Sequence, residues 1–174
     1  NLVNQEGELE YEHLCWDPVI FLVQSAHPCC RYARYRDTFY HPWIDLREFE
    51  QEIFILQHQG QSLRQYSDQL LEEAGLSPQR ITRIRNIETA AQMAANGLGV
   101  SFCLESYFRH MMFIQPPYRF SVGERQLAAD FSAAYRRGRQ LPEYTVQFIH
   151  LLKNLMEMEV GRMVEMDKSV NKNL

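Results

Sequence analysis

The sequence predicts an α/β fold in which mostly parallel sheets are flanked by helices, and three observations favour this class. Runs of β-branched and aromatic residues, typical of strands buried on both faces, occur at residues 19–24, 53–57 and 99–103. Residues 81–85 alternate apolar and charged side chains, as a half-exposed strand does. Helical spacing of apolar residues appears between residues 57 and 81 and between 85 and 99. This alternation is typical of right-handed βαβ units around a mainly parallel sheet.

Length and composition are those of an ordinary globular protein. The chain has 174 residues, of which 45% are hydrophobic and 23% charged, and this length suits one domain or two small lobes. The longest uninterrupted apolar run, residues 19–23, is far shorter than the roughly 20 residues of a membrane span. No secretion signal is present, so we expect a cytoplasmic protein. Because the first residue is Asn1, we expect an excised or cleaved piece of a longer chain.

Charge and cysteine usage argue against further classes. The formal net charge of −4 is unlike the strongly basic surface that binds duplex DNA. Cys15, Cys29, Cys30 and Cys103 lack the spacing of a secreted disulfide framework, so we expect reduced thiols. No further pair of ligands completes a metal site around His27, Cys29 and Cys30. We therefore predict neither a metal nor a cofactor.

The first third of the chain has one clear strand. Residues 9–16 suit a short strand or a crossing segment, and the buried strand at 19–23 ends before Pro28, which cannot donate to a ladder. Residues 28–43 have no clear period and suit a loop with a helical turn. Residues 45–51 suggest a short helix.

The middle of the chain carries helix start and stop signals. Ser62 and Gln65 have the spacing of a capping box, which predicts a helix that ends near Gly75. Asn86 is expected to cap a second helix that extends to residue 95, where Gly97 supplies a left-handed stop. A strand should follow at residues 98–104.

The last third is predicted to hold one strand and one long helix. Residues 111–122 are irregular, residues 126–135 suit a long strand, and residues 136–138 form a turn. Pro142 at a first helical position opens a helix over residues 142–158. We expect a polar tail over residues 161–174.

Three stretches together resemble the effector-binding domain of LysR-type transcription regulators. The first is the segment 10–14, Glu-Tyr-Glu-His-Leu, followed by residues 18–28, which end in His-Pro. The second is residues 87–106, a helix followed by a Gly-Leu-Gly turn and a strand. The third is residues 131–154, a strand, an Arg-rich turn and a helix. Each stretch alone is a weak motif, but their order and separation make the resemblance fairly specific over residues 9–157.

The resemblance implies a two-lobed fold like that of type 2 periplasmic binding proteins, with a small-molecule effector held between the lobes. Residues 1–18 would begin the chain and form part of the first lobe, and residues 19–118 would form the second lobe. Residues 119–160 would return to the first lobe, which is incomplete here. The family's helix-turn-helix and the opening strand-helix-strand of its first lobe are absent from these 174 residues. Either they lie in a longer parent chain, or the chain is a truncated relative.

Two strand-to-helix junctions, at residues 57–64 and 85–89, are the candidate effector site. Helix starts leave free N–H groups that attract anions or carbonyl oxygens, and such junctions line the ligand crevice of open parallel sheets. The alternative reading is that Ser62 and Asn86 only cap helices, that Arg64 is a solvated arginine and that Phe102 is a core aromatic. The candidate effector-binding residues are Gln59, Gly60, Ser62, Arg64, Asn86, Ile87, Thr89, Ser101 and Phe102.

The sequence is consistent with three classes of function. The resemblance favours an effector-sensing, non-enzymatic domain of a transcription regulator that is a dimer or tetramer and reaches DNA only through the absent helix-turn-helix. A small α/β enzyme with Cys103 or His110 in a spatially assembled site is the second, although no catalytic motif is present. A ligand-free oligomerisation domain is the third. We expect the chain to dimerise through elements of residues 126–160, or to pair with its missing segment, because these elements lack part of their expected neighbours.

Overall fold

The computed structural model describes residues 8–170, and the side chains of residues 8–156. Its backbone forms two compact units. The larger unit is the continuous segment from Pro18 to Ala128. The smaller unit combines the described residues before Pro18 with those from Ala129 onward. The chain therefore passes between the two units after Asp17 and again after Ala128.

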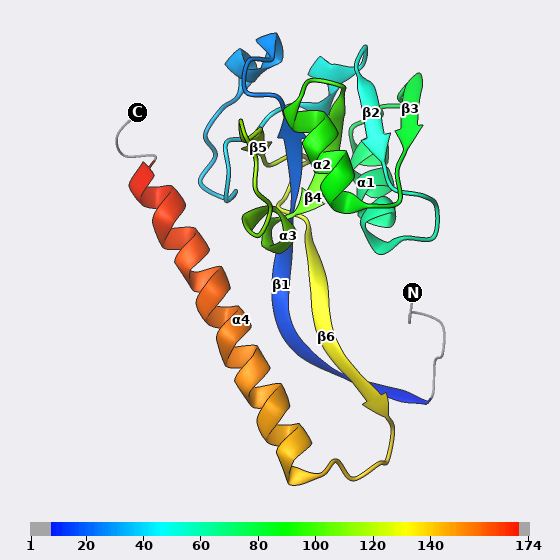
Figure 1. Cartoon of the computed structure of the whole chain (residues 1–174), viewed down its shortest axis with the longest axis vertical. Coiled ribbons are helices and arrows are strands. Elements are labelled where there is room, and N and C mark those ends of the chain that lie inside the picture. Colours follow the sequence, from blue (N-terminus) through cyan, green and yellow to red (C-terminus); the bar gives the residue numbers. More distant parts are fainter. Residues whose placement is uncertain (1–7, 171–174) are drawn as a thin grey trace. The chain divides into compact units, whose positions relative to one another are not determined.

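One long strand, β1 (Leu9–Val23), contributes residues to both units (Figure 1). It joins the segment at 9–16 and the strand at 19–23, which the sequence suggested as separate pieces. One of its pairing partners is β6 (Ala128–Arg136). The backbone N–H of Arg137 donates to the carbonyl of Glu8 at 2.8 Å, and that of Val19 donates to Leu127 at 2.9 Å. The contacts run in opposite order along the two segments, so β1 and β6 are antiparallel.

The larger unit is built on a mixed sheet with the strand order β3-β2-β4-β1-β5. Its parallel part consists of β2 (Ile53–Leu56), which pairs with β3 (Arg80–Arg83) and β4 (Val100–Leu104). β5 (Tyr118–Phe120) pairs with β1 in the antiparallel sense. The α/β class is confirmed, and three of the four predicted core strands are parallel.

The expectation that the strand at residues 19–24 is also parallel is wrong. β1 runs antiparallel to β4, with Val19 opposite Leu104 and Leu22 opposite Ser101. Between β1 and β2 the chain forms only the short 3₁₀ helices η1 (Pro28–Tyr32) and η2 (Leu46–Phe49). No crossover α-helix therefore forces β1 to run with β2. A continuous apolar run reveals burial on both faces but not strand direction.

The helices α1 (Ser62–Glu73) and α2 (Ile87–Ala95) cover opposite faces of the sheet. Ala91 and Ala94 of α2 are buried with Ile20, Leu22 and Cys103, which point to one face. The opposite face carries an aromatic cluster in which the ring of Phe21 lies 5.1 Å from both Phe49 and Phe102 and 6.2 Å from Phe54. Leu71 of α1 lies near Leu56, whose side chain shares this face with Phe54 because strand side chains alternate.

Two glycines after α2 have backbone requirements that explain their position. Gly97 has a φ of +75°, which is left-handed and ends the helix as expected. A Cβ on Gly99 would overlap the carbonyl oxygen of Ile53 on the neighbouring strand. Gly99 therefore permits the close approach of β4 to β2. The sequence did not indicate α3 (Glu105–Arg109), because five residues are too few for a helical period.

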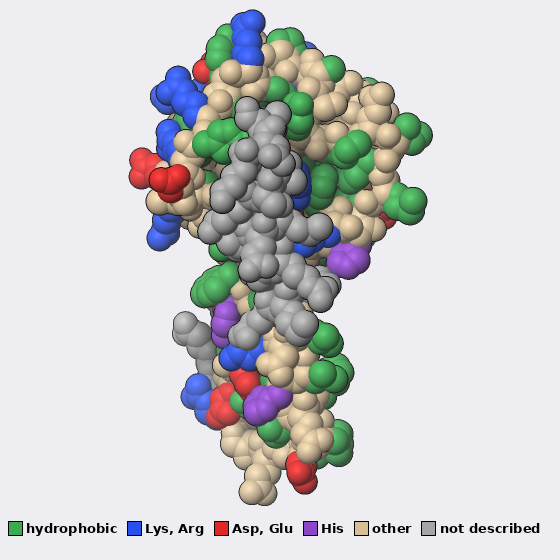
Figure 2. Space-filling view, turned by 90° about the vertical axis from the view of Figure 1, so that its left-hand side faces the viewer, with side chains coloured by type: hydrophobic (Ala, Val, Ile, Leu, Met, Phe, Trp, Pro, Cys, Tyr) green, Lys and Arg blue, Asp and Glu red, His purple; other side chains and the backbone are tan. Residues whose placement is uncertain are grey.

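The smaller unit ends in the long helix α4 (Glu143–Val170). Pro142, predicted as the first helical residue, lies directly before the helix, which extends well beyond residue 158 and through much of the expected polar tail. Ile149 is buried on one side of α4. Large hydrophobic side chains are nevertheless exposed on this unit, seen in the lower part of Figure 2. Among the described residues, no helix combines the length and apolar character that crossing a membrane demands.

Candidate functional site

The strand order places a change in winding direction beside β2. From β2 the chain passes through α1 to β3 on one side, and from β3 it returns through α2 to β4 on the other side of β2. In open parallel sheets, ligands bind beyond the carboxyl ends of the strands at such a point. The two predicted junctions, at residues 57–64 and 85–89, follow the carboxyl ends of β2 and β3.

The side chain of Gln61 connects these two junctions. Its Nε2 donates to the backbone carbonyl of Arg85 at 3.1 Å, and its Oε1 accepts from the backbone N–H of His58 at 3.1 Å. Gln61 is also the N-cap residue of α1, but its side chain makes no capping bond there. The predicted capping box is therefore wrong, because Ser62 is already the first residue of the helix. Sequence reasoning missed Gln61, since glutamine at this position has no known signature.

Asn86 caps α2 as predicted, because its Oδ1 accepts the backbone N–H of Thr89 at 2.8 Å. Ile87 is the first residue of the helix and is half-buried. On the β2 side, Gln59 and Gly60 are exposed, and Gly60 turns the chain with a φ of +87°. The exposed candidates from both junctions therefore border the ends of neighbouring parallel strands.

Gln57, directly after β2, is a buried amide without a partner. Gln57 is 0% exposed to solvent. Neither Oε1 nor Nε2 of its side chain makes a hydrogen bond within the part of the chain that the structure describes. An unsatisfied buried polar group costs about 1–3 kcal/mol, so its retention asks for an explanation such as a ligand or an ordered water. The sequence contained no signal for Gln57, because burial of a glutamine is a tertiary property.

Ser101 and Phe102 lie inside the core rather than at a surface. Both have 0% exposure. The hydroxyl of Ser101 donates to the carbonyl of Ile55 at 2.8 Å, which ties β4 to β2. The ring of Phe102 belongs to the aromatic cluster around Phe21. We assign structural roles to these two side chains, since β4 is covered on both faces.

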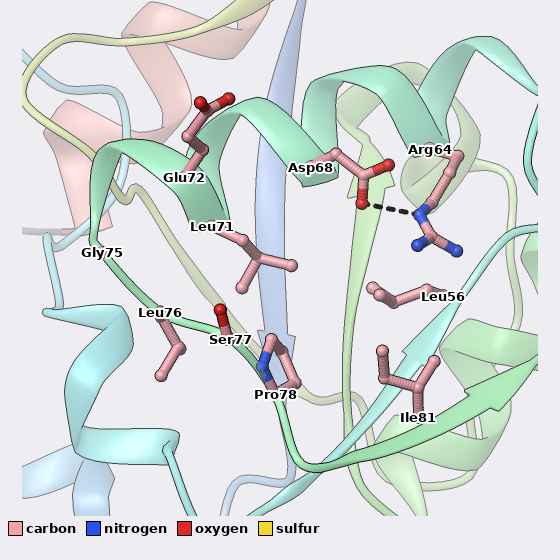
Figure 3. Close-up of a pocket in the computed structure, with 10 residues that line it drawn as sticks. All are labelled: Leu56, Arg64, Asp68, Leu71, Glu72, Gly75, Leu76, Ser77, Pro78 and Ile81. Atoms are coloured by element: carbon pink, nitrogen blue, oxygen red, sulfur yellow. Dashed lines mark hydrogen bonds and ion pairs between the residues drawn. The ribbon is translucent and has the colours of Figure 1, made fainter.

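Arg64 is buried under α1 and is not a solvated arginine. Its side chain is 8% exposed, its Nε donates to Oδ1 of Asp68 at 2.7 Å, and its Nη1 donates to the carbonyl of Gln57 at 3.0 Å. Together with Asp68 it lines a cavity of about 490 Å³ between α1 and β3 (Figure 3). The other lining residues are Leu56, Leu71, Glu72, Gly75, Leu76, Ser77, Pro78 and Ile81.

Comparison with protein families decides the assignment of the chain. The family model described as the LysR substrate binding domain matches residues 2–157. The chain belongs to this family. Membership makes the chain an effector-sensing regulatory domain with the periplasmic-binding-protein-like fold of its class. No curated protein matches the sequence.

Solved structures share the fold at low sequence identity. The CcmR regulatory domain from Synechocystis PCC6803, in complex with 2-PG, is 18% identical with a TM-score of 0.69, over 87% of this chain and 68% of that one. The BenM effector binding domain with its effector benzoate is 14% identical with a TM-score of 0.67, over 90% and 67% of the two chains. A mutant of OxyR from Corynebacterium glutamicum is 19% identical with a TM-score of 0.70, over 98% and 49%. This LysR substrate-binding domain thus spans about two thirds of isolated regulatory domains and half of the longer regulator.

A buried ionic cluster holds three segments of the larger unit together. Glu105, at the start of α3, is 1% exposed. Its Oε2 accepts from Nε2 of His41 at 2.8 Å, and its Oε1 accepts from Arg119 at 2.7 Å and from Arg109 at 3.3 Å. Burial alone raises the pKa of Glu105, but the hydrogen bond and charge of His41 and the charges of Arg119 and Arg109 outweigh it and lower the pKa to about 2. The cluster joins the loop of His41 to α3 and β5.

Cys103 and His110, the two side chains considered for catalysis, lie in different surroundings, since the first is buried and the second is exposed. Cys103 is fully buried and its thiol donates to the carbonyl of Leu104 at 3.3 Å. His110 is exposed at the end of α3, with Nδ1 2.7 Å from the carbonyl of Ser106. Cys15, Cys29, Cys30 and Cys103, all among the described residues, form no disulfide. Within residues 8–156, no group of three or more His, Cys, Asp or Glu side chains is arranged to hold a metal.

Proposed function

We propose that this LysR substrate-binding domain holds a small anionic effector at the two junctions that follow β2 and β3. The observation that carries the proposal is the bond from Gln61 to Arg85, which joins both helix starts beside the unpartnered amide of Gln57. Free N–H groups at the start of a helix favour a negative charge. The proposed contacts are Gln57, Gln59, Gly60, Gln61, Ser62, Asn86, Ile87 and Thr89.

Effectors named with solved relatives support this class of ligand. BenM is described with benzoate, a small carboxylate, and CcmR with 2-PG.

The proposed regulator acts in the cytoplasm without catalysis. Effector binding changes the geometry of a dimer or tetramer, and thereby DNA binding by a helix-turn-helix elsewhere in a longer parent protein.

Thermal unfolding of the chain with a panel of small carboxylates, benzoate among them, tests the effector site. A ligand that binds only the folded state raises stability by RT ln(1 + [L]/Kd). We expect at least one carboxylate to raise the unfolding midpoint in a dose-dependent way, while its primary amide does not. If no carboxylate in the panel raised the unfolding midpoint, the proposed anion site would be refuted.

Gln57→Leu separates a binding role from a structural one. Replacing an unpartnered buried amide by an apolar side chain of similar volume should leave the free chain as stable or more stable, while the response to the carboxylate is lost. Gln65→Leu, at an exposed position of α1, is the matched control and should keep the response. A destabilised free protein, or an unchanged response, would contradict the role of Gln57.

Association is the second part of the proposal, and α4 supports it. Tyr144, Phe148, Leu151 and Leu155 are 51–74% exposed and follow each other at intervals of four, three and four residues. This spacing places them along one stripe of the helix. We propose that the stripe is covered by a second copy of the chain in a homodimer, or in a tetramer built from such dimers.

A further inference from the structure

The cavity under α1 has the size of a small-molecule site and lies apart from the proposed effector contacts. It is bounded by the end of β2, by α1, by the loop between α1 and β3, and by β3 itself (Figure 3). Its volume of about 490 Å³ falls within the roughly 300–1,000 Å³ that is usual for ligand pockets. None of the proposed effector contacts is among its lining residues, although the backbone carbonyls of Gln57 and Gln61 accept hydrogen bonds from Arg64.

The floor of the cavity is apolar. Leu56 and Ile81 point to the same face of neighbouring parallel strands, because Phe54 is paired with Ile81 and side chains alternate along β2. Leu71 of α1 and Leu76 of the following loop close two further sides. Figure 3 shows the side chains of Leu56, Leu71 and Ile81 directed toward a common space. An apolar ligand there would remove this surface from water.

One end of the cavity presents a buried hydrogen-bond donor. Arg64 is 8% exposed, and its guanidinium points into the space beside Leu56 in Figure 3. Nε and Nη1 donate to Asp68 and Gln57, whereas Nη2 makes no hydrogen bond to any residue that the structure describes. A guanidinium has five N–H donors. The remaining donors therefore suit an oxygen acceptor on a bound molecule.

The surrounding charges select an uncharged ligand. Asp68 already neutralises Arg64 across 2.7 Å, and Glu72 adds a second carboxylate to the lining one helical turn further on. The lining thus carries one positive and two negative groups, which disfavours an incoming anion. A cationic group on the ligand would be repelled by Arg64 and offers it no acceptor. A neutral carbonyl or amide oxygen meets both conditions.

We propose that this cavity is a second small-molecule site, which takes a mostly apolar, uncharged molecule whose carbonyl oxygen accepts from Nη2 of Arg64. The site goes beyond the proposed effector function and differs from it in ligand charge. It is also connected to the effector junction, since Nη1 of Arg64 donates to the carbonyl of Gln57.

Titration of the ¹⁵N-labelled full chain with 2-naphthylacetamide tests the proposal. We expect saturable shifts of the amide signals of Leu71, Leu76 and Ile81, with a Kd on the order of 1 mM for a fragment of this size. The matched probes 2-naphthylacetate and 2-(2-naphthyl)ethylamine should bind at least fivefold more weakly. Equal or tighter binding of either charged probe would overturn the ligand class.

Two variants with a matched control locate the site. Ser77→Trp places a ring in the cavity from an exposed loop residue and should abolish binding of 2-naphthylacetamide, while Gln79→Trp, outside the lining on the same loop, should not. Arg64→Met should weaken binding at least fivefold. Undiminished binding by Ser77→Trp would refute the site. Shifts centred on residues 59–62 and 86–89 would also refute it, because the probe would then bind at the proposed effector site. Failure of the cavity site would not change the response to carboxylates that is expected at residues 57–64 and 85–89.

Discussion

His41 donates from Nε2 to Oε2 of Glu105 across 2.8 Å, although 64 positions separate the two residues in the chain. Both side chains are at least nine-tenths buried. The pair fixes the irregular loop around His41 against the start of α3, and Arg119 brings β5 to the same carboxylate. The charged network thus acts beside the isolated β-bridges that Trp43 forms with Arg34 and Ser121.

Glu105→Gln should lower the free energy of unfolding by about 3 kcal/mol, because it removes the buried negative charge that compensates Arg109 and Arg119 and is hydrogen-bonded to His41. Urea denaturation followed by circular dichroism provides the measurement. Glu124→Gln, an exposed neighbour of β5, should change stability by less than about 0.5 kcal/mol. Equal effects of the two variants would contradict the importance of the cluster.

Acid should destabilise the protein through the same carboxylate. The pKa of Glu105 is lowered from 4.5 to about 2 in the folded state, so the unfolded state binds the proton more readily. The stabilising contribution is fully present above pH 4.5 and is lost as the pH falls toward 2. Denaturation between pH 5 and 2 should therefore show a component in the wild type that Glu105→Gln lacks.

Gly99→Ala should be more destabilising than Gly97→Ala. The added methyl group at position 99 would overlap the backbone carbonyl of Ile53, which the sheet holds in place. At position 97 it would stand 2.6 Å from Oε1 of Gln24, the end of a flexible side chain that moves aside. We expect about 1 kcal/mol for Gly97→Ala from its left-handed φ, and at least twice that value for Gly99→Ala. Thermal unfolding of both variants decides the order.

The helix starts predict opposite results for two polar residues. Asn86→Ala removes a capping bond of 2.8 Å and should cost about 1 kcal/mol. Ser62→Ala should change the free energy of unfolding by less than about 0.5 kcal/mol, because Gln61 rather than Ser62 occupies the N-cap of α1. A large effect of Ser62→Ala would restore the capping box that the sequence suggested.

Phe148→Glu should weaken association if α4 is covered by a second copy. Phe148 is 62% exposed, and a carboxylate in the middle of a buried apolar stripe is unfavourable. Multi-angle light scattering at micromolar concentration should find a dimer or tetramer for the wild type and a smaller species for the variant. His150→Glu, exposed on another side of α4, is the control. A monomeric wild type would show that the stripe has another role.

The positions of secondary structure could be predicted where the local sequence carries the cause. Asn86 binds a backbone N–H three residues away, and Gly97 adopts a conformation that other residues disfavour, so both mark helix ends within a few residues of chain. Buried strands at residues 53–56 and 100–104 are visible as β-branched and aromatic runs. The capping box at Ser62 failed because a short motif also fits a helix that begins one residue earlier.

The candidate site could be predicted only in part. Its two junctions follow from strand-then-helix order, but Gln57 and Gln61 carry no signature in the sequence. The partners of Gln61 are the backbone groups of His58 and Arg85, and the second of these belongs to another strand. Ser101 and Phe102 are the reverse case, since a position near a glycine turn does not reveal that both side chains are buried.

The sequence by itself determined the class of fold, the family resemblance and the helix ends at Asn86 and Gly97, because these depend on contacts between neighbours in the chain and on patterns of polarity. The tertiary structure decided the direction of β1, the burial of Arg64 beside a cavity and the meeting of His41 with Glu105. The physical reason is that each of these depends on which distant segment packs against a residue, and the free energy of such packing belongs to both segments together.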